Sequence, residues 1–506
     1  MKKAIKTLST LIPIIVLFTF IKVNANNTIT IDSSKPRTTD TNSYYVTNQE
    51  TFTITSVESN DKFKVYKILD TYYNDNTNVI TYEFTNTFKS YLESTDKYKD
   101  YTIKDYQKLT SGSIESGSTK TTSTLDKLVS RFVSYIKTNS NTGTQMTTNG
   151  NTANIQLEAG SYLALPISTT KIYAVMVGNI EFSESGGEWI LNPASIVAKK
   201  SNPGIYKTID DYTSTTSSRN IDQDFEFRIS LTIPQYPTNA TNKLYRIEDI
   251  LDPGITFNGI SSMKIKDSET YLTIECDGTV KDENNNIVGS IVVNEQTITF
   301  DFNVDYITSD KMIIFYKSHL NDNATLGLRN SNNSTATLTY ANDPYGTGIQ
   351  NSSVNTKLYT YGLEILVYDS TDETKLLSNV TFDVQYSSWP YTKIATITTD
   401  QNGRATLKGI VSKTYDLKQT KTATGYILLE DSISATVNPN DSNRVAGTEE
   451  GYFLTKIAID KIGLLPITGG SGIIIFVIFG VLFTLVDIVG FIIYRKKTTK
   501  KKNLTN

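Results

Sequence analysis

One stretch decides the fold class of this chain: Phe225-Glu226-Phe227-Arg228-Ile229-Ser230-Leu231-Thr232-Ile233. Its odd-numbered positions are apolar and its even-numbered positions are polar or charged. Because successive side chains of a β-strand point to opposite faces, this alternation predicts a strand with one buried face. The composition agrees, since 31 Tyr residues and abundant Thr favour strands, while Asn, Asp and Gly clusters supply turns. We therefore predict an all-β protein in which such strands form sandwiches.

The length of the chain suggests about three domains of ordinary size. Residues 35–198 form the first predicted domain, in which strand-like segments flank apolar residues at helical spacing between positions 125 and 136. We expect this domain to be a β-domain with a helical insertion. Residues 200–353, which contain the alternating stretch, form the second domain, and residues 357–462 form the third.

Both ends of the chain carry segments typical of export. Lysines precede an apolar run at residues 8–21, and small side chains follow near Ala25, so residues 1–25 are predicted to be a secretory signal peptide. Near the other end, residues 473–493 are apolar and long enough for a transmembrane helix. The basic residues of the tail, 494–506, predict that this tail stays in the cytoplasm.

A short motif stands directly before the apolar segment: Leu465-Pro466-Ile467-Thr468-Gly469. It resembles the LPxTG sorting signal, which sortases cleave between Thr and Gly before they join the Thr carbonyl to an amine. The motif, the apolar span and the basic tail together favour a sorting signal over the alternative, a plain membrane anchor beside an incidental turn. Cleavage after Thr468 leaves residues 26–468 as the expected mature chain.

The composition argues against several classes of function. The signal peptide carries four lysines, and the segment after Thr468 carries six basic residues and one acid, so the formal net charge falls from −3 to −12 in the mature chain. Such an acidic protein is a poor candidate for binding nucleic acid. With Cys276 and His319 as the single residues of their types, we expect no disulfide and no transition-metal site. No nucleophile elbow or phosphate-binding glycine loop occurs, so we expect neither a cofactor nor catalysis of an external reaction. Alternation around Cys276 predicts a buried strand residue.

Over all three predicted domains, the chain resembles the backbone pilins of Gram-positive bacteria, of the sortase-assembled SpaA type. The resemblance implies Ig-like domains of the Cna protein B type, strung in line. It also implies a pilin motif between the first and second domains, where a Trp precedes the lysine that accepts the sorting signal of another subunit. Here Trp189 precedes Lys199 and Lys200, and Val197-Ala198 stand where Tyr-Pro is usual. We predict Lys199 as the acceptor, with Lys200 as the alternative.

Members of this family often form an internal Lys–Asn isopeptide bond with the help of a buried acid. Burial disfavours charge on both groups, which leaves a neutral amine to attack and a protonated acid to relay protons. The resemblance of the second domain implies Lys207 as the nucleophile and Asp249 as the acid. Ser334 stands at the family's Asn position, so the partner is either Asn333, turned inward by a bulge, or Asn332, which shares the face of the apolar residues that follow. We choose Asn333.

The third domain carries an altered form of the family's E-box at residues 415–426. Gln419 replaces the expected glutamate, Val367 the expected lysine and Asp460 the expected asparagine. Because all three members of the triad differ together, no single buried charge is left unpaired. We therefore predict the same sandwich without its cross-link.

The resemblance implies a structural function. We expect the shaft subunit of a covalent pilus on the cell wall of a Gram-positive bacterium, in which a class C pilin sortase joins Thr468 to Lys199 of an identical subunit. Minor pilins, and peptidoglycan through a housekeeping sortase, are further expected partners, and the membrane holds the chain only before sorting. The alternative is a minor pilin or a monomeric wall-anchored adhesin, while an enzyme has no support beyond the anchor.

Overall fold

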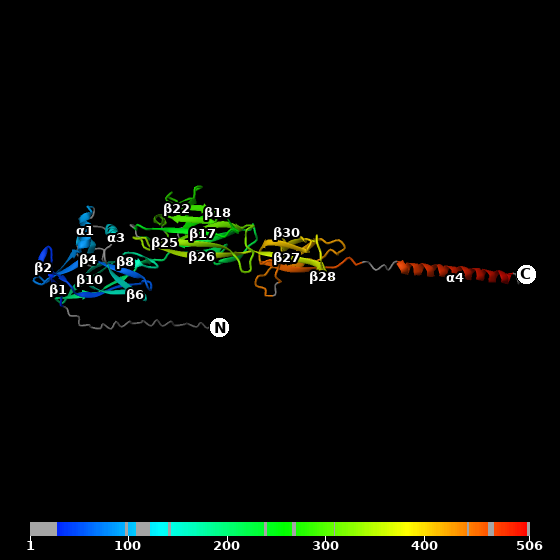
Figure 1. Cartoon of the computed structure of the whole chain (residues 1–506), viewed down its shortest axis with the longest axis horizontal. Helices are drawn as coiled ribbons and strands as arrows, with labels where there is room; N and C mark the ends of the chain where they lie inside the picture. The colour runs from blue at the N-terminus through cyan, green and yellow to red at the C-terminus, as the bar shows by residue number, and fades with distance from the viewer. Residues whose placement is uncertain are drawn as a thin grey trace, which may run out of the picture.

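The computed structural model describes residues 28–96, 100–107, 122–139, 143–236, 240–265, 270–307, 309–442, 445–463 and 470–502. The chain forms three β-units in a row, and a long helix extends away from the third unit (Figure 1). Within these ranges, strands build all three units, which confirms the predicted all-β fold class. The predicted signal peptide, residues 1–25, and the predicted sorting motif, residues 465–469, lie outside the described residues.

The first unit is a large sheet that curls around its own core. Its strands are β1 (Ile31–Arg37), β2 (Asp40–Val46), β3 (Gln49–Thr55), β4 (Lys62–Asn74), β5 (Val79–Phe84), β6 (Thr144–Asn149), β7 (Thr152–Glu158), β8 (Gly160–Ser168), β9 (Ile172–Tyr173), β10 (Met176–Ser185), β11 (Glu188–Asn192), β12 (Ala194–Val197) and β13 (Lys200–Ser201). The main path of the sheet is β11-β10-β8-β4-β6-β7-β3-β12, and β13 pairs separately with β9. Strand β4 is central because its 13 residues pair with β2, β5, β6 and β8 at different places.

Among the described residues between 85 and 143, three helices form the insertion that the helical spacing predicted. They are α1 (Asn86–Ser94), α2 (Ile103–Gln107) and α3 (Thr122–Thr138), and they lie between β5 and β6. The apolar face of α3 is buried against α1, where the rings of Phe132 and Phe88 pack edge to face at 4.4 Å. The helices share this apolar cluster with Ile68 of β4 and Leu163 of β8, so the insertion covers one side of the sheet.

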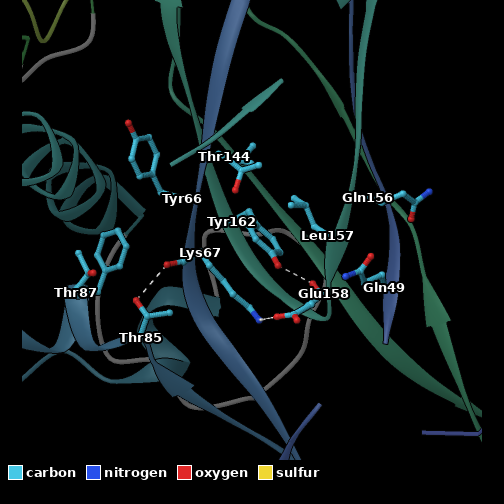
Figure 2. Close-up of a pocket in the computed structure, with 12 residues that line it drawn as sticks. Gln49, Tyr66, Lys67, Thr85, Thr87, Thr144, Gln156, Leu157, Glu158 and Tyr162 are labelled. Carbon is cyan, nitrogen blue, oxygen red and sulfur yellow. Dashed lines mark hydrogen bonds and ion pairs between the residues drawn. The ribbon is translucent and has the colours of Figure 1, made fainter. Parts of the chain in front are cut away.

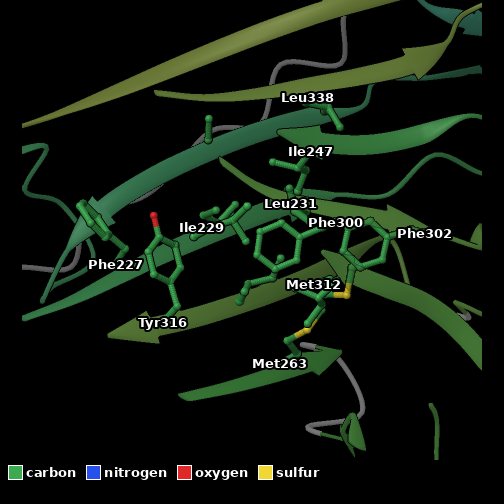
Figure 3. Close-up of a cluster of buried hydrophobic side chains, with 14 of the residues drawn as sticks. Phe227, Ile229, Leu231, Ile247, Met263, Phe300, Phe302, Met312, Tyr316 and Leu338 are labelled. Atoms are coloured by element: carbon green, nitrogen blue, oxygen red, sulfur yellow. The ribbon is translucent and has the colours of Figure 1, made fainter. Parts of the chain in front are cut away.

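The second unit is a sandwich of a five-stranded sheet, β14-β16-β24-β18-β19, and an eight-stranded sheet, β15-β26-β25-β17-β23-β22-β21-β20. The strands are β14 (Gly204–Ile209), β15 (Thr216–Ser218), β16 (Asp224–Thr232), β17 (Tyr245–Leu251), β18 (Ile255–Ile265), β19 (Thr270–Tyr271), β20 (Thr273–Ile274), β21 (Thr279–Lys281), β22 (Ile287–Asn294), β23 (Thr297–Phe302), β24 (Lys311–Leu320), β25 (Asn332–Ala341) and β26 (Ile349–Tyr359), with a 3₁₀ turn η2 (Val304–Tyr306). The alternating stretch forms β16, and its apolar side chains face the core as predicted. Figure 3 shows Phe227, Ile229 and Leu231 of this strand in the cluster that includes Ile247 and Leu338 of the other sheet.

Cys276 departs from the sequence expectation. The strand β20 ends at Ile274, and Cys276 lies in the tight turn that leads to β21, where its side chain is exposed. The turn closes when Gly278 N–H donates to Glu275 O over 3.0 Å. The prediction of a buried residue was wrong because the alternation of side chains stops where the strand ends.

The third unit is a smaller sandwich of two four-stranded sheets. Its strands are β27 (Tyr361–Asp369), β28 (Asp372–Leu376), β29 (Thr381–Tyr386), β30 (Lys393–Thr398), β31 (Arg404–Ile410), β32 (Thr414–Lys421), β33 (Ile433–Thr436) and β34 (Tyr452–Ile459). The first and last strands, β27 and β34, pair in parallel. The helix α4 (Gly470–Lys502) follows, and its segment Ile475–Thr498 is long and apolar enough to cross a membrane.

Side chains from the second unit dock on the first. Asp343 forms an ion pair with Lys137 of α3, and the Tyr345 hydroxyl lies 3.2 Å from the Ser130 hydroxyl. Tyr345 also belongs to the apolar cluster of the helical insertion. The seam between these two units is therefore a packed joint.

The second and third units meet at a close backbone contact. Ile221 N–H donates to Gly409 O over 2.9 Å, and Asn220 Nδ2 donates to the Tyr386 hydroxyl over 2.8 Å. A Cβ at Gly409 would lie 2.3 Å from the Ile221 side chain, and the φ of +79° also suits glycine. The contact keeps these two units in line (Figure 1).

Candidate functional site

Lys199 and Lys200 lie at the seam between the first and second units. After β12 ends at Val197, the chain runs beside β9, where Ala174 N–H donates to Lys199 O over 3.0 Å. Lys200 pairs with Tyr173 in the β13–β9 ladder. Because the pairing continues across both lysines, their side chains point to opposite sides of the extended segment. Both residues are exposed.

The amines at this seam differ in their surroundings. The Lys200 Nζ lies 2.6 Å from Glu58 Oε1, and its hydrogen bond and charge hold the pKa of the Glu58 carboxyl below its usual range. The nearby Lys171 Nζ donates to Asn202 Oδ1 over 2.6 Å. For the Lys199 amine, the described part of the chain provides no hydrogen bond and no ion pair.

Trp189 of the predicted pilin motif lies at the other end of the first unit. Its indole Nε1 donates to Asn78 Oδ1 over 2.9 Å. Asn78 precedes β5, which pairs with the Asn74 end of β4, whereas the seam adjoins the Lys62 end of the same strand. The tryptophan therefore lies about one strand length from the two lysines.

In the second unit, Lys207 and Asp249 meet in the core between the two sheets. Lys207 comes from β14 in one sheet and Asp249 from β17 in the other, and both side chains are fully buried. The Lys207 Nζ lies 2.5 Å from Asp249 Oδ2 and 2.7 Å from the Tyr316 hydroxyl, and it also donates to the Ser334 hydroxyl. Tyr316 and Ser334 donate in turn to the Asp249 carboxylate, over 2.6 and 2.8 Å. The structure thus brings together two of the three predicted residues and adds two hydroxyls.

Burial dominates the electrostatics of this cluster. It lowers the pKa of Lys207 to about 8 against the opposing charge of Asp249, and it raises the pKa of Tyr316 well above its usual value. The Lys207 ammonium also lies 4.2 Å from the centre of the Phe227 ring, a favourable cation–π distance. Lys207 therefore loses its proton more readily than a surface lysine, as an attacking amine must.

The third predicted residue, Asn333, does not reach Lys207. Its Nδ2 donates to Asp252 Oδ2 over 2.9 Å, on the outer side of β25. Asn332 faces inward, but its amide binds the backbone of Thr325 at 2.9 and 3.1 Å. The register of β25 against β26 is continuous through these positions, so the bulge needed to turn Asn333 inward is absent. This geometry corrects the choice of Asn333.

Ser334 occupies the place of the missing asparagine. It is fully buried and contacts both Lys207 and Asp249. A serine hydroxyl has no carbonyl carbon for the Lys207 amine to attack, so this cluster cannot form the Lys–Asn bond that the family resemblance implied. It holds a buried ion pair instead.

The three altered positions of the third unit also lack an amine. Val367 is a core residue of β27, and Asp460 accepts a hydrogen bond from the Ser370 hydroxyl after the end of β34. Gln419 Oε1 accepts from Leu429 N–H over 2.7 Å, while its Nε2 is buried without a partner among the described residues. With an aliphatic side chain at position 367, the lysine nucleophile of the family triad has no counterpart there.

Sequence reasoning missed a buried carboxylate beside these positions. Asp369 ends β27 with a fully buried side chain, and the Lys461 Nζ lies 2.8 Å from its Oδ2. Thr371 and the Tyr426 hydroxyl also donate to it, and these donors, Lys461 foremost, hold the pKa of Asp369 well below its usual range. The available signal was an acid at the end of a mostly apolar strand-like segment, 363–368, which is typical of an ordinary turn.

The first unit contains a polar pocket of about 490 Å³ beside the start of α1 (Figure 2). Lys67 and Glu158 face each other in it, 3.4 Å apart. The Lys67 Nζ donates to the Tyr45 hydroxyl over 2.7 Å, and the Tyr162 hydroxyl donates to Glu158 O over 2.7 Å. Because these polar groups bind one another, the pocket presents a satisfied ion pair.

Comparison with known proteins agrees with this architecture. The family described as "SpaA: Prealbumin-like fold domain" matches residues 363–450, in the third unit. The trypsin-resistant surface T6 protein of Streptococcus pyogenes serotype M6 is 29% identical over 261 residues, which cover 48% of this chain and 47% of that protein. The chain thus spans about half the length of this curated relative.

Solved pilin structures share the fold. The T6 backbone pilin of serotype M6 Streptococcus pyogenes superposes with a TM-score of 0.62 at 19% identity, over 82% of this chain and 99% of that one. The major pilin SpaD of Corynebacterium diphtheriae gives a TM-score of 0.54 at 15% identity, over 82% and 98%. This chain is therefore homologous to the T6 backbone pilin, carries a SpaA-type prealbumin-like domain, and has the fold of the major pilins of Gram-positive bacteria.

Proposed function

We propose that this chain is the repeating subunit of a covalent pilus shaft, in which a class C sortase joins Thr468 of one copy to Lys199 of the next. The pilin fold and the homology to a backbone pilin support the structural role. One observation points to Lys199 in particular: its amine is exposed and has no partner among the described residues. By contrast, the Lys200 amine pairs with Glu58 and the Lys171 amine donates to Asn202.

In this proposal the chain is a substrate and the sortase supplies the catalysis. The sortase thiolate attacks the carbonyl carbon of Thr468, the bond to Gly469 breaks, and the released segment leaves with a free amino group. The neutral amine of Lys199 then attacks the thioester carbon, an amide forms, and the thiolate leaves. The reaction requires an exposed amine at this position, and Lys199 is exposed.

The arrangement of the units suits a filament. Lys199 lies between the first and second units, and the third unit forms the other end of the row (Figure 1). The sorting motif follows the third unit in the sequence. A link between these two places is heterologous and does not close on itself, so repeated linking extends a fibre. We propose residues 35–198, 200–353 and 357–462 as the three domains of the secreted subunit, displayed on the cell wall.

An immunoblot of boiled, denatured cell-wall extract tests the proposal. Wild type and Lys200→Ala should both give a ladder of covalent polymers, because Lys199 remains available. Lys199→Ala should remove most of the ladder and leave monomer as the main band. A single wall-linked band in all three strains would favour the alternative, a minor pilin or monomeric adhesin. A ladder lost with Lys200→Ala would move the acceptor to Lys200.

A further inference from the structure

The seam presents two adjacent lysines to any incoming acyl-enzyme, yet one of them is restrained. Lys199 and Lys200 are neighbours in sequence, and both are exposed. The Lys200 ammonium is paired with Glu58 at 2.6 Å, with side-chain exposures of 32% and 40% for the two residues. Two consecutive lysines are equally close to an incoming acyl-enzyme. The ion pair of Lys200 with Glu58 is therefore the feature that can make the enzyme choose between them.

The loop that carries Glu58 is fixed by buried groups. Glu58 N–H donates to the Tyr173 hydroxyl over 3.0 Å, and this hydroxyl donates to Asp61 Oδ2 over 2.7 Å. Asp61 N–H donates to Glu58 O over 3.2 Å, and this hydrogen bond closes the turn. Tyr173 is fully buried, and its ring packs edge to face on Phe63 at 5.2 Å. The backbone of Glu58 is therefore held in place before any lysine approaches it.

The same tyrosine also places Lys200. Tyr173 is the ladder partner of Lys200 in the β13–β9 pair. Tyr173 therefore holds the backbone of both Glu58 and Lys200, so the two charged side chains start from fixed positions. Lys199 is one residue away, and its side chain leaves the opposite side of the extended segment.

We propose that Glu58 is a specificity-determining residue of the linkage reaction, which sequesters Lys200 and directs the acyl-enzyme to Lys199. This inference rests on the proposed function. An attacking lysine must be free to move toward the thioester, and the Glu58 carboxylate holds the Lys200 amine 2.6 Å away in an ion pair. Ion pairs of this exposure are modest, so we expect a bias of up to about fivefold from this contact.

Mapping of the linkage site in the polymer tests the inference. The cell-wall polymer is digested, and mass spectrometry measures the ratio of branched peptides linked through Lys200 to those linked through Lys199. Glu58→Gln removes the charge and preserves the size, and we expect it to raise this ratio severalfold. Glu283→Gln removes one exposed acid in the second unit and should leave the ratio at the wild-type value.

A second comparison uses the Lys199→Ala background. There Lys200 is the remaining neighbour, and Lys199→Ala combined with Glu58→Gln should restore part of the ladder that Lys199→Ala loses. An unchanged linkage ratio with no restored ladder would overturn the role of Glu58 and leave the shaft proposal standing. Linkage through Lys200 in wild type would also overturn it. Absence of any polymer in wild type would instead overturn the shaft proposal itself.

Discussion

The Nζ of Lys207 lies 2.5 Å from Asp249 Oδ2 in the core of the second unit, where both side chains are fully buried. Each charge is tolerated there because the other is present, since a lone buried charge costs several kcal/mol. The hydroxyls of Tyr316 and Ser334 complete the hydrogen bonding of the carboxylate. The pair joins β14 to β17 across the sandwich without a covalent bond.

Removal of one partner should destabilise the second unit strongly. Asp249→Ala leaves the Lys207 amine buried without its counter-ion, and we expect the unfolding free energy of this unit to fall by about 3–5 kcal/mol. Hydrogen exchange of the β14 and β17 amides in increasing urea measures the loss. The double variant Lys207→Met with Asp249→Leu replaces the pair by apolar groups and should recover most of it. A double variant as unstable as Asp249→Ala would contradict this account.

A single substitution should convert the ion pair into a covalent cross-link. Ser334→Asn places a carboxamide beside the Lys207 amine, whose pKa of about 8 makes its neutral form accessible. Attack on the carboxamide carbon forms an amide, ammonia leaves, and Asp249 relays the protons. The intact mass of Ser334→Asn should then be lower by one ammonia than its sequence requires. Wild type should show its full sequence mass.

Two controls make this prediction specific. Ser334→Asn combined with Lys207→Ala removes the nucleophile and should keep the full sequence mass. Asn333→Ala should not change the mass of wild type, because the Asn333 amide binds Asp252 on the other side of the strand. A wild-type chain that lacks one ammonia, with the deficit abolished by Asn333→Ala, would reinstate the original choice of partner.

The sequence predicts the elements whose signals are local. Alternation along β16 identified the buried face of the second unit, and helical spacing identified α3. Because side chains alternate along β25, Asn332 and Ser334 point inward and Asn333 points outward. Asn333 could turn inward only at a bulge, and the continuous pairing of β25 with β26 contains none. The family spacing places Ser334 at the position of the asparagine, and strand parity alone predicts that Asn333 points outward.

Contacts between distant segments were beyond sequence reasoning. Asp369 and Lys461 become neighbours because β27 and β34 pair in parallel, which neither segment reveals alone. The pairing of Glu58 with Lys200 likewise depends on a loop fixed by Tyr173 from a third segment. Buried polar groups of this kind are identified only when the strands that carry them are placed side by side.

The second unit should become more stable as pH rises through the alkaline range. The pKa of Lys207 is about 8 in the folded chain and returns toward its ordinary 10.5 on unfolding. Between these values the unfolded chain binds more protons, so the unfolding free energy rises with pH, by about 3 kcal/mol at most. Urea unfolding of wild type and of the double variant Lys207→Met with Asp249→Leu at a series of pH values isolates this effect, because the double variant lacks the titrating amine and leaves no unpaired carboxylate. Equal slopes in the two proteins would contradict the prediction.

Asp369 should hold the last strand of the third unit in place. In the proposed fibre, tension transmitted through Thr468 would act on this strand, β34. Lys461, just beyond the end of β34, pairs with Asp369 at 2.8 Å. Because the folded pKa of Asp369 lies well below 3.8, its contribution is present above that pH and is lost as the pH falls below it. Asp369→Asn should therefore lower the melting temperature of this unit at neutral pH and matter progressively less in acid. Lys375→Ala, whose exposed amine lies 3.8 Å from the same carboxylate, should have a smaller effect. An effect of Asp369→Asn that stays constant into strong acid would show that the carboxylate charge is not what holds β34.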